Sequence, residues 1–515
     1  MRTSHKIATK LLKKNDICKK IVRKFAIVQK MLYLCSRVGM VLHGSGVLCL
    51  SRPSASALPA ATFSCAGNHG KYCFQPIKLL IMIEHLIPAW MLIPFVVMLL
   101  CIAILPLIPH VGEWWEHNLH KLYVSLILGV PVGIWLCVNG MSHDLIHQMI
   151  YDYVPFILLL MALFVTTGGI CIRGDLKATP LTNTIIMGIG WVLASFMGTT
   201  GAAMLLIRLL LETISQRKYK VHTVLFFIAI VANCGGLLSP LGDPPLFLLF
   251  QKGTPFMWWM QNMAVEWLVT GGLLLLVYFV VDTYLFRKEP TVNIMADVRE
   301  ARKLQFSGLI NILWLLCVIA STFFINSTYI PAMGEHDAPW YLKLLREWVF
   351  IAIIAASWLT TKKKVREDNS YSWVPIMEVA CVFLGIFATM TPALMFLKQN
   401  PLPVTAPWQF VYCTGALSAF LDNAPTAMVF HATATTLPSD VATAVAGIAP
   451  EFMKAISMGA VFFGALTYIG NGPNFMVKSI AEQAGIDMPS FFGYMIKFSL
   501  IVCLPIYIIV QLLFI

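Results

Sequence analysis

Charged side chains are scarce in this sequence. Asp, Glu, Lys and Arg make up only 12% of its 515 residues, whereas hydrophobic residues make up 58%. A soluble protein of this length needs far more charge on its surface, so the composition excludes a soluble globular chain. It predicts an all-α polytopic membrane protein in contact with a lipid bilayer, because apolar helices satisfy their own backbone hydrogen bonds in hydrocarbon.

The sequence also lacks the spaced cysteine and histidine pairs of a metal centre. Its 13 cysteines show no CxxC or CxxH spacing, and those beyond residue 81 lie mostly in apolar runs, where Cys behaves as a small hydrophobic residue. A Walker A motif is absent as well. We therefore expect no disulfide framework and no resident cofactor, and we expect an ion gradient to drive any transport.

Positive charge is concentrated at one end of the chain. Residues 1–81 hold 14 Lys and Arg against one acidic residue, a balance of +13, while residues 82–515 hold 23 against 24, a balance of −1. The net charge of +12 therefore belongs to this basic lead and does not indicate a nucleic-acid partner. We interpret residues 1–81 as a mis-annotated start, with translation beginning at Met82, or as a disordered or targeting segment.

From residue 82 onward, apolar segments follow one another at lengths near the roughly 20 residues that a helix needs to cross a bilayer. A charged cytoplasmic connector at 287–304 separates a first transmembrane repeat, 82–286, from a second, 305–515. The predicted segments are 87–108, 120–139, 154–171, 183–213, 222–251, 264–286, 305–326, 344–360, 374–397, 407–437, 452–484 and 491–514.

Two of these segments are interrupted by glycine and proline. VANCGGLLSPLGDPP at 231–245 and FGALTYIGNGPNF at 463–475 cannot sustain a helical hydrogen-bond ladder. In hydrocarbon, such a break is tolerated only where protein or a water-filled cavity surrounds the freed N–H and C=O groups. Because secondary transporters build their ion sites from helices broken at mid-membrane, the pattern predicts a carrier.

The two halves of the sequence match each other locally. Residues 203–204 correspond to 427–428 at an offset of 224, and residues 236–242 correspond to 464–470 at an offset of 228. Near-equal offsets at two separate places indicate an internal duplication.

The distribution of Lys and Arg in short loops predicts the orientation of these repeats. Segment 183–213, interrupted by GTTGAA, begins and ends beside basic loops, whereas 407–437, interrupted by LDNAPTA, begins and ends beside loops without Lys or Arg. Each segment is therefore predicted to be a re-entrant hairpin, the first opening to the cytoplasm and the second to the opposite side. The two repeats are thus predicted to have inverted topology.

Candidate cation ligands gather at the hairpin tips and the breaks, because Na⁺ binds the oxygens of carboxylates, amides, hydroxyls and unwound carbonyls. They are Thr199, Thr200, Asn233, Ser239 and Asp243 in the first half, and Asp422, Asn423, Thr426, Thr467, Asn471 and Asn474 in the second. Burial disfavours an ionised carboxylate, so Asp243 and Asp422 are each expected to hold either a proton or Na⁺.

Structural roles remain open for several of these residues. Asp243 and Asp422 precede Pro-containing helix starts and have the character of N-caps. Asn471 and Asn474 can instead satisfy freed backbone groups. Outside these motifs, Arg208 is expected to reach the cytoplasmic surface, Glu378 and Asp152 to lie at the membrane interface, and His431 to be an ordinary packed side chain.

The strings ANCGGLLSPLGD, FLDNAPTAMV and ALTYIGNGPNF resemble the signature stretches of NhaD-type sodium/proton antiporters. These belong to the ion-transporter superfamily that also contains citrate and arsenite carriers. The resemblance covers most of 82–515 and implies exchange of Na⁺ or Li⁺ for H⁺ by alternating access, with small inorganic cations as the partners. It also implies a multi-pass protein of a bacterial-type inner (plasma) membrane and, because carriers of this superfamily are often dimers, a homodimer.

Two alternatives to exchange remain. The first is a sodium-coupled or proton-coupled anion carrier of the citrate, dicarboxylate or arsenite type, although an acidic hairpin tip would repel an anion. The second is an intramembrane aspartyl protease, because Tyr151-Asp152, residues 241–243 and residues 392–394 imitate its YD, GxGD and PAL motifs. Pro240 replaces the first Gly of GxGD, and a predicted hairpin separates the two aspartates, so no enzymatic activity is expected.

Overall fold

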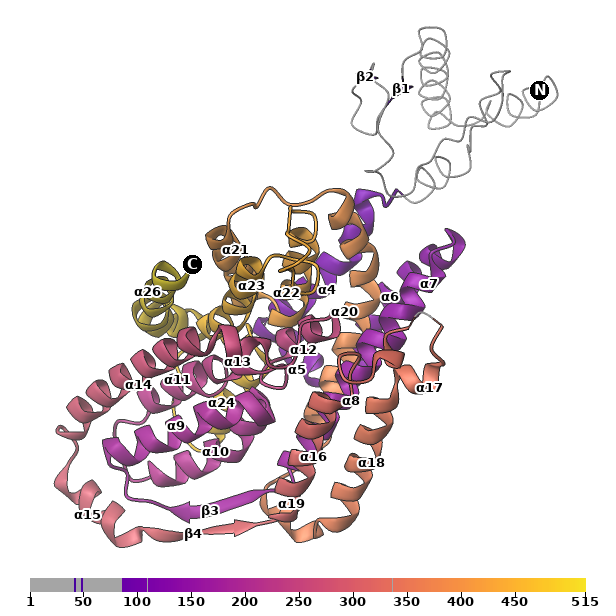
Figure 1. Cartoon of the computed structure of the whole chain (residues 1–515). Coiled ribbons are helices and arrows are strands. Elements are labelled where there is room, and N and C mark those ends of the chain that lie inside the picture. Colours follow the sequence, from indigo (N-terminus) through magenta and orange to yellow (C-terminus); the bar gives the residue numbers. More distant parts are fainter. Residues whose placement is uncertain (1–40, 43–47, 50–85, 109, 336) are drawn as a thin grey trace, which may run out of the picture. The chain divides into compact units, whose positions relative to one another are not determined.

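The computed structural model of this chain describes residues 41–42, 48–49, 86–108, 110–335 and 337–515 (Figure 1). The chain divides into two units, Met1–Ile81 and Met82–Ile515. In the first unit the structure describes β1 (Val41–Leu42) and β2 (Leu48–Cys49), which pair in antiparallel fashion. The interpretation of residues 1–81 as a mis-annotated start or a targeting segment otherwise lies outside the described residues.

The second unit is built almost entirely of helices, which confirms the predicted all-α polytopic membrane protein. In the described part of the chain, seven helices are long and apolar enough to cross a membrane. They are Asn118–Val138, Ser142–Thr167, Pro180–Met197, Val221–Leu238, Ala264–Phe286, Val374–Gln399 and Phe491–Phe514. Many of their large apolar side chains are exposed, as expected for a surface that meets lipid.

The elements before residue 287 include both the first hairpin and the first broken helix. They are η2 (Ala89–Leu92), α4 (Ile93–Ile104), η3 (Leu105–Leu107), α5 (Val111–Glu116), α6 (Asn118–Val138), α7 (Ser142–His147), η4 (Gln148–Tyr153), α8 (Val154–Thr167), β3 (Cys171–Asp175), α9 (Pro180–Met197), α10 (Thr199–Thr213), α11 (Val221–Ile230), η5 (Cys234–Leu238), α12 (Pro244–Gln251), α13 (Trp258–Asn262) and α14 (Ala264–Phe286).

The later elements include the connector, the second hairpin and the second broken helix. They are α15 (Thr291–Glu300), β4 (Arg302–Ser307), α16 (Ile310–Phe324), η6 (Pro331–Met333), α17 (Trp340–Lys343), α18 (Leu345–Thr360), α19 (Lys363–Asp368), α20 (Val374–Gln399), α21 (Pro407–Phe420), α22 (Asn423–Ala434), α23 (Pro450–Phe463), η7 (Gly464–Leu466), α24 (Gly472–Gln483), α25 (Phe491–Tyr494), η8 (Met495–Cys503) and α26 (Leu504–Phe514).

Both predicted hairpins are pairs of helices joined at a sharp break. Between α9 and α10 stands Gly198 with φ +80°, a conformation that glycine adopts without a Cβ clash. Between α21 and α22 the chain is extended at Leu421 and Asp422. The two arms of each hairpin pack against each other.

Each hairpin also packs against the broken helix of the other half of the chain. The second arm of the first hairpin, α10, contacts α24, and the second arm of the second hairpin, α22, contacts α12. Because α12 and α24 both begin directly after a break, this exchange brings the two hairpin tips and the two breaks together. The inverted topology of the two repeats stays a prediction.

The residues between the predicted segments 120–139 and 154–171 are mostly helical, although a loop was expected there. Residues 142–147 form α7, and 148–153 form the π-helical segment η4, which runs directly into α8. A proline ring clashes with the carbonyl four residues earlier, and a π-helical turn relieves that clash. Pro155 follows η4 closely, and Pro505 stands in the same relation to the second π-helical segment, η8. Scattered polar residues made 141–153 resemble a loop.

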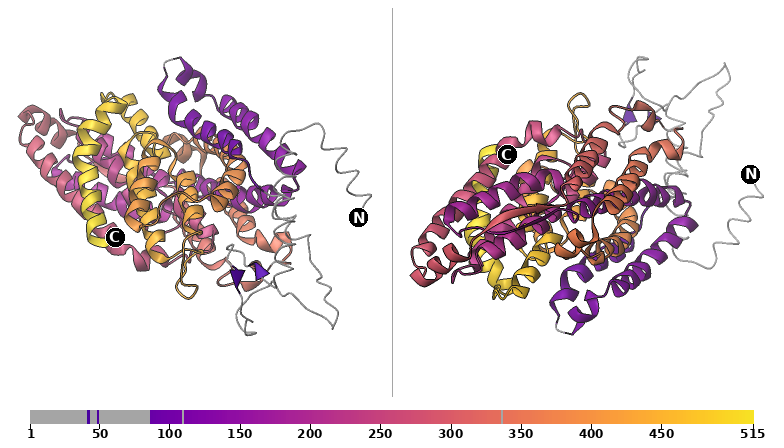
Figure 2. Two further views of the ribbon diagram at one scale, coloured as in Figure 1. Left: turned by 90° about the horizontal axis from the view of Figure 1, so that it is seen from above. Right: turned by 90° about the horizontal axis from the view of Figure 1, so that it is seen from below.

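The charged connector is also more ordered than its composition indicates. It contains α15 and the start of β4, and β4 pairs in antiparallel fashion with β3, so that Cys171 lies opposite Ser307 and Ile172 opposite Phe306. A register shift occurs at Gly174, whose φ is +151°. Figures 1 and 2 show these two strands running side by side between the helices around α9 and α15 and those around α16 and α19. The ribbon thus links the segment before the first hairpin to the second half of the chain.

Packing of α14 on α9 depends on a glycine. Trp191 of α9 stacks on Trp267 of α14 with ring centroids 3.7 Å apart, and a Cβ added at Gly271 would lie 2.2 Å from the Trp191 ring. Gly271→Ala is therefore expected to destabilise the protein by about 1–3 kcal/mol through overpacking. The midpoint of thermal unfolding of the purified protein in detergent measures this loss.

The neighbouring glycine provides the control. A Cβ at Gly272 would meet nothing within 4 Å, so Gly272→Ala is expected to leave the unfolding midpoint unchanged or slightly raised. Equal midpoints for the two variants would contradict the packing described for α9 and α14.

Candidate functional site

Asp243 stands at the first break with its side chain free of local bonds. It occupies the N-cap position of α12, but its carboxylate makes no capping hydrogen bond. The next two residues, Pro244 and Pro245, have no N–H group, so the start of the helix offers fewer donors than usual. The alternative that Asp243 serves as a helix cap is therefore wrong, and its carboxylate is available to other elements.

Three donors from three other elements surround this carboxylate. Thr199 Oγ1, at the first hairpin tip, donates to Asp243 Oδ1 over 2.9 Å. Asn471 Nδ2, at the second break, donates to the same oxygen over 3.0 Å, and Asn423 Nδ2, at the second hairpin tip, donates to Oδ2 over 2.5 Å. Asp243 is only 2% exposed, and such donors offset the cost of burying its charge.

The four side chains form two corresponding pairs. Asn423 lies 224 positions after Thr199, and Asn471 lies 228 positions after Asp243, which are the two offsets of the internal match. In each pair, one member comes from each half of the chain. Of these four positions, only that of Asp243 carries a charge.

A network of amides lies behind these four residues. Asn471 Nδ2 also donates to Asn233 Oδ1 over 3.2 Å, and Asn233 Nδ2 donates to Asn474 Oδ1 over 2.7 Å. The amide of Asn474 donates in turn to the carbonyls of Gly464 and Thr467, at 2.8 and 2.9 Å. Asn474 thus satisfies carbonyls freed by the second break, which was the structural alternative for this residue. The network also fixes Asn471 beside Asp243.

Two of the predicted hydroxyl ligands instead hold each hairpin to the break of its own half. Ser239 Oγ donates to the carbonyl of Ser195 in α9, and Thr467 Oγ1 donates to the carbonyl of Ala419 in α21. Donors and acceptors again correspond at offsets of 228 and 224. All four residues are buried.

The remaining predicted residues lie at the hairpin tips but do not bond to Asp243. Asp422 accepts a hydrogen bond from the N–H of Ala424 over 3.0 Å and so caps α22. This is the contact expected from its alternative role as a helix cap. Thr426 Oγ1 donates to the carbonyl of Asp422 over 2.9 Å. Thr200 is half-buried and lines the cavity beside Asp243.

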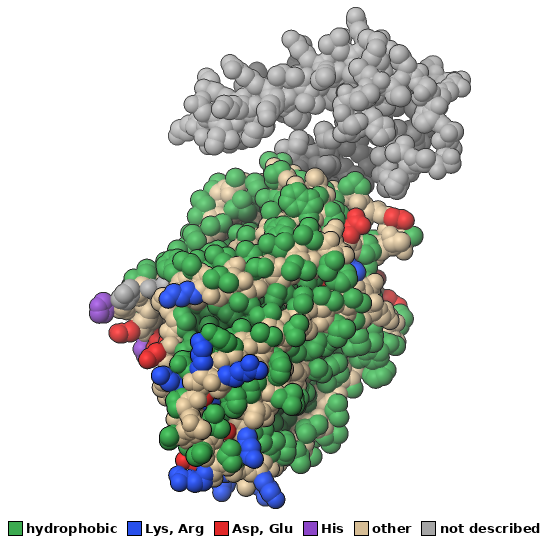
Figure 3. Space-filling view, turned by 90° about the vertical axis from the view of Figure 1, so that its left-hand side faces the viewer, with side chains coloured by type: hydrophobic (Ala, Val, Ile, Leu, Met, Phe, Trp, Pro, Cys, Tyr) green, Lys and Arg blue, Asp and Glu red, His purple; other side chains and the backbone are tan. Residues whose placement is uncertain are grey.

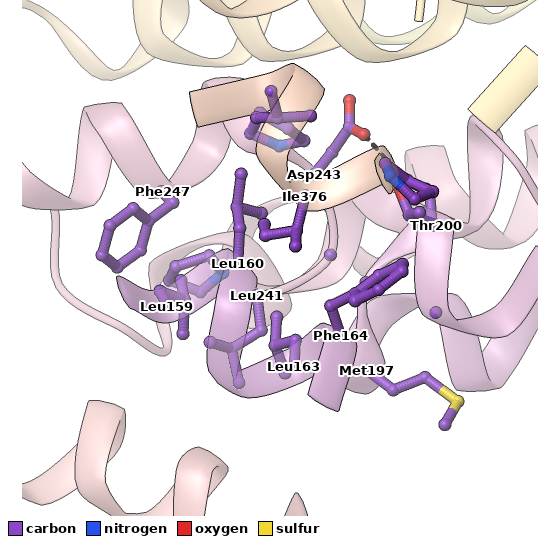
Figure 4. Close-up of a pocket in the computed structure, with 18 residues that line it drawn as sticks. Leu159, Leu160, Leu163, Phe164, Met197, Thr200, Leu241, Asp243, Phe247 and Ile376 are labelled. Atoms are coloured by element: carbon purple, nitrogen blue, oxygen red, sulfur yellow. Dashed lines mark hydrogen bonds between the residues drawn. The ribbon is translucent and has the colours of Figure 1, made fainter. Parts of the chain in front are cut away.

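A cavity of about 80 Å³ opens onto Asp243, Thr199 and Thr200. Figure 4 shows Asp243 and Thr200 at one side of the cavity, with apolar side chains of α8, α12 and α20 forming its other walls. The described residues that line it include no Lys, Arg or His. Because a water molecule needs only about 10–15 Å³, the space suits a few waters or a small ion.

Sequence patterns did not reveal three ion pairs between distant parts of the chain. Lys252 Nζ lies 2.6 Å from Asp152 Oδ2, Lys454 Nζ lies 2.8 Å from Glu266 Oε1, and Lys121 pairs with Glu378 over 2.7 Å. The partners in each pair are far apart in the sequence, so no local spacing could have connected them. In each pair one partner is buried, and the pairing offsets the cost of burying its charge.

Asp152, Arg208 and His431, which the sequence analysis also considered, all have partners away from Asp243. Asp152 pairs with Lys252, whereas Asp243 accepts from Thr199, Asn423 and Asn471, so the two aspartates share none of these partners. Arg208 donates to Ser370 Oγ over 2.6 Å, and His431 contacts the carbonyl of Ala446. None of these three groups makes a hydrogen bond to Asp243 in the described part of the chain.

Broken helices, paired hairpins and a polar site where both meet are features of secondary transporters. Residues 84–515 match the model of the family described as "Putative citrate transport", and the chain therefore belongs to this family of membrane transporters. No curated protein matches the chain significantly.

The hydrogen bonds of Ser239 and Thr467 are expected to stabilise the site region equally. Ser239→Ala and Thr467→Val each leave a buried carbonyl without its donor, so each is expected to cost about 1–3 kcal/mol. The midpoint of thermal unfolding in detergent measures the loss. Thr443→Val, in an exposed loop, is the control and should leave the midpoint unchanged. A large loss for one variant and none for the other would contradict equivalent roles.

Proposed function

We propose that this protein exchanges Na⁺ or Li⁺ for H⁺ by alternating access, with the carboxylate of Asp243 as the group that the two ions share. The observation that carries the proposal is the position of this carboxylate. It is buried, it makes no local capping bond, and it meets side chains from both hairpin tips and from the second break.

Burial makes the two ions alternatives for one another. An ionised carboxylate without compensation is costly in a site of low polarity, and either a bound proton or a bound cation removes that cost. Once one of them is present, the other gains little by binding. The site therefore favours exchange of the two ions over their joint transport.

The neighbouring side chains supply the further oxygens that a small cation needs. The Thr199 hydroxyl and, after rotation of their amides, the oxygens of Asn423 and Asn471 can join the Asp243 carboxylate around one ion. Asp422, one residue before Asn423, adds negative charge at the same hairpin tip and favours the entry of a cation. Asn233 and Asn474 hold Asn471 in place, and Thr200 lines the entrance.

Alternating access requires that the site open to each side of the membrane in turn. The cavity between α8, α20 and the first hairpin tip provides one route to Asp243. With the two halves as inverted repeats, a related movement of the second hairpin opens the opposite route. The resemblance to NhaD-type antiporters further supports a location in a bacterial-type inner membrane and a homodimeric assembly.

A second candidate is the transport of a carboxylated anion such as citrate, which the family description favours. Four helices, α10, α12, α22 and α24, begin at the site, and helix N-termini attract negative charge. Asp243, however, already lies among these N-termini. A tricarboxylate would have to compete with this fixed carboxylate, without help from a basic side chain among the described residues that line the cavity.

Purified protein in liposomes with an acidic interior and a pH-sensitive dye tests the proposal. External Na⁺ or Li⁺ is expected to raise the internal pH, because protons leave the liposome in exchange for the cations that enter it. Asp243→Asn removes the titratable oxygen and should reduce the rate to that of empty liposomes. Asp440→Asn, the same change in an exposed loop, should retain the full rate.

Citrate provides the contrasting substrate in the same liposomes. We expect no uptake of labelled citrate and no change of internal pH when citrate is added. Citrate uptake together with no response to Na⁺ or Li⁺ would overturn the exchange proposal in favour of the anion carrier.

A further inference from the structure

The connector between the two halves of the chain, residues 287–304, buries most of its acidic side chains and exposes its basic ones. Two of its acidic residues face inward. Glu289 accepts hydrogen bonds from the N–H groups of Lys218 and Tyr219, at 3.0 and 2.8 Å. Asp297 accepts from the N–H of Ala178 with both oxygens, at 3.2 and 3.0 Å. Both carboxylates are buried, so they contribute little negative charge to the outer surface.

The basic residues of the connector face outward. All five of them are exposed: Arg287, Lys288, Arg299, Arg302 and Lys303. The remaining acidic residue, Glu300, is exposed and accepts a hydrogen bond from Gln216 Nε2 over 2.9 Å. The outer surface of the connector is therefore strongly positive.

The connector helix α15 also carries an exposed apolar strip. Val292, Met295 and Val298 of α15 are 76%, 68% and 50% exposed, and their spacing of three residues places them on one face. A soluble surface rarely leaves such a row uncovered. The helix α14 ends four residues before α15 and exposes large apolar side chains over its last turns, including Phe279, Val280 and Tyr284. The strip therefore follows, in the sequence, the exposed apolar end of a helix long enough to span a membrane.

Lys and Arg side chains gather toward one end of the apolar face that includes this part of the molecule. Figure 3 shows hydrophobic side chains covering most of one face, with Lys and Arg side chains toward its lower part. Figure 1 places α15 at the lower end of the structure, next to the end of α14. A band of apolar side chains edged by positive charge matches the order of acyl chains and headgroups in a bilayer.

We propose that α15 and the adjoining basic residues form a binding surface for anionic phospholipids. Val292, Met295 and Val298 enter the apolar layer, and the exposed Lys and Arg side chains of the connector bind the phosphate groups of the headgroups. Because the inward carboxylates bind the loops that flank the first hairpin, α9 and α10, this surface fixes those loops at the membrane interface. The proposal does not depend on which ion or anion the protein transports.

Thermal unfolding of the full chain in nanodiscs of stated composition tests this surface. Wild-type protein is compared in phosphatidylcholine alone and in phosphatidylcholine with one quarter phosphatidylglycerol. A lipid that binds the folded protein raises its unfolding midpoint. We expect phosphatidylglycerol to raise the midpoint by a few degrees, and we expect 1 M NaCl, where the screening length is only about 3 Å, to abolish the rise.

A triple variant and a matched control assign the effect to the connector. The variant combines Arg287→Gln, Arg299→Gln and Lys303→Gln. The control combines Lys362→Gln, Lys363→Gln and Lys364→Gln, which removes the same number of exposed charges from the start of α19. The connector variant should lose more than half of the rise caused by phosphatidylglycerol, while the control should keep it.

Three outcomes would overturn the proposal. They are no rise for wild-type protein, a full rise for the connector variant, and an equal loss in the connector variant and the control. Midpoints that depend on the number of protein copies in each nanodisc, with no dependence on lipid charge, would show that a second copy covers the strip instead.

Discussion

One buried carboxylate, held by donors from both halves of the chain, is the interaction on which the rest of this structure depends. Asp243 is tolerable in the membrane because Thr199, Asn423 and Asn471 surround it. Those donors reach it only because two hairpins and two broken helices meet at one place. The broken backbone of the two segments is thus the condition for the polar site, and the surrounding helices shield it from lipid.

Local sequence chemistry keeps this carboxylate free. Prolines after Asp243 remove nearby N–H donors, whereas Ala424 keeps its N–H, which donates to the carboxylate of Asp422 in a capping hydrogen bond. Two aspartates at similar helix starts therefore make different contacts. The symmetric hydrogen bonds of Ser239 and Thr467 hold each hairpin to its break and so keep the tips in position.

The sequence predicted the elements whose signal is local. Glycine and proline marked both breaks and both hairpin tips, and oxygen-bearing side chains at those places included Thr199, Asn423 and Asn471. It did not separate these ligands from Thr426 or Ser239, because hydroxyls near a break bind backbone carbonyls equally well and only the fold decides. The pair Lys252–Asp152 and the helix at 142–153 were missed, since one depends on distant contacts and the other on a π-helical turn before Pro155.

The central claim is that a cation and a proton occupy the same carboxylate in turn. Its most direct test is the release of protons when NaCl or LiCl is added to purified protein in weakly buffered detergent solution, followed with a pH indicator against choline chloride. Our account predicts saturable release that approaches one proton per bound cation and disappears in Asp243→Asn. Saturable cation binding without proton release, or equal release from Asp243→Asn, would contradict it.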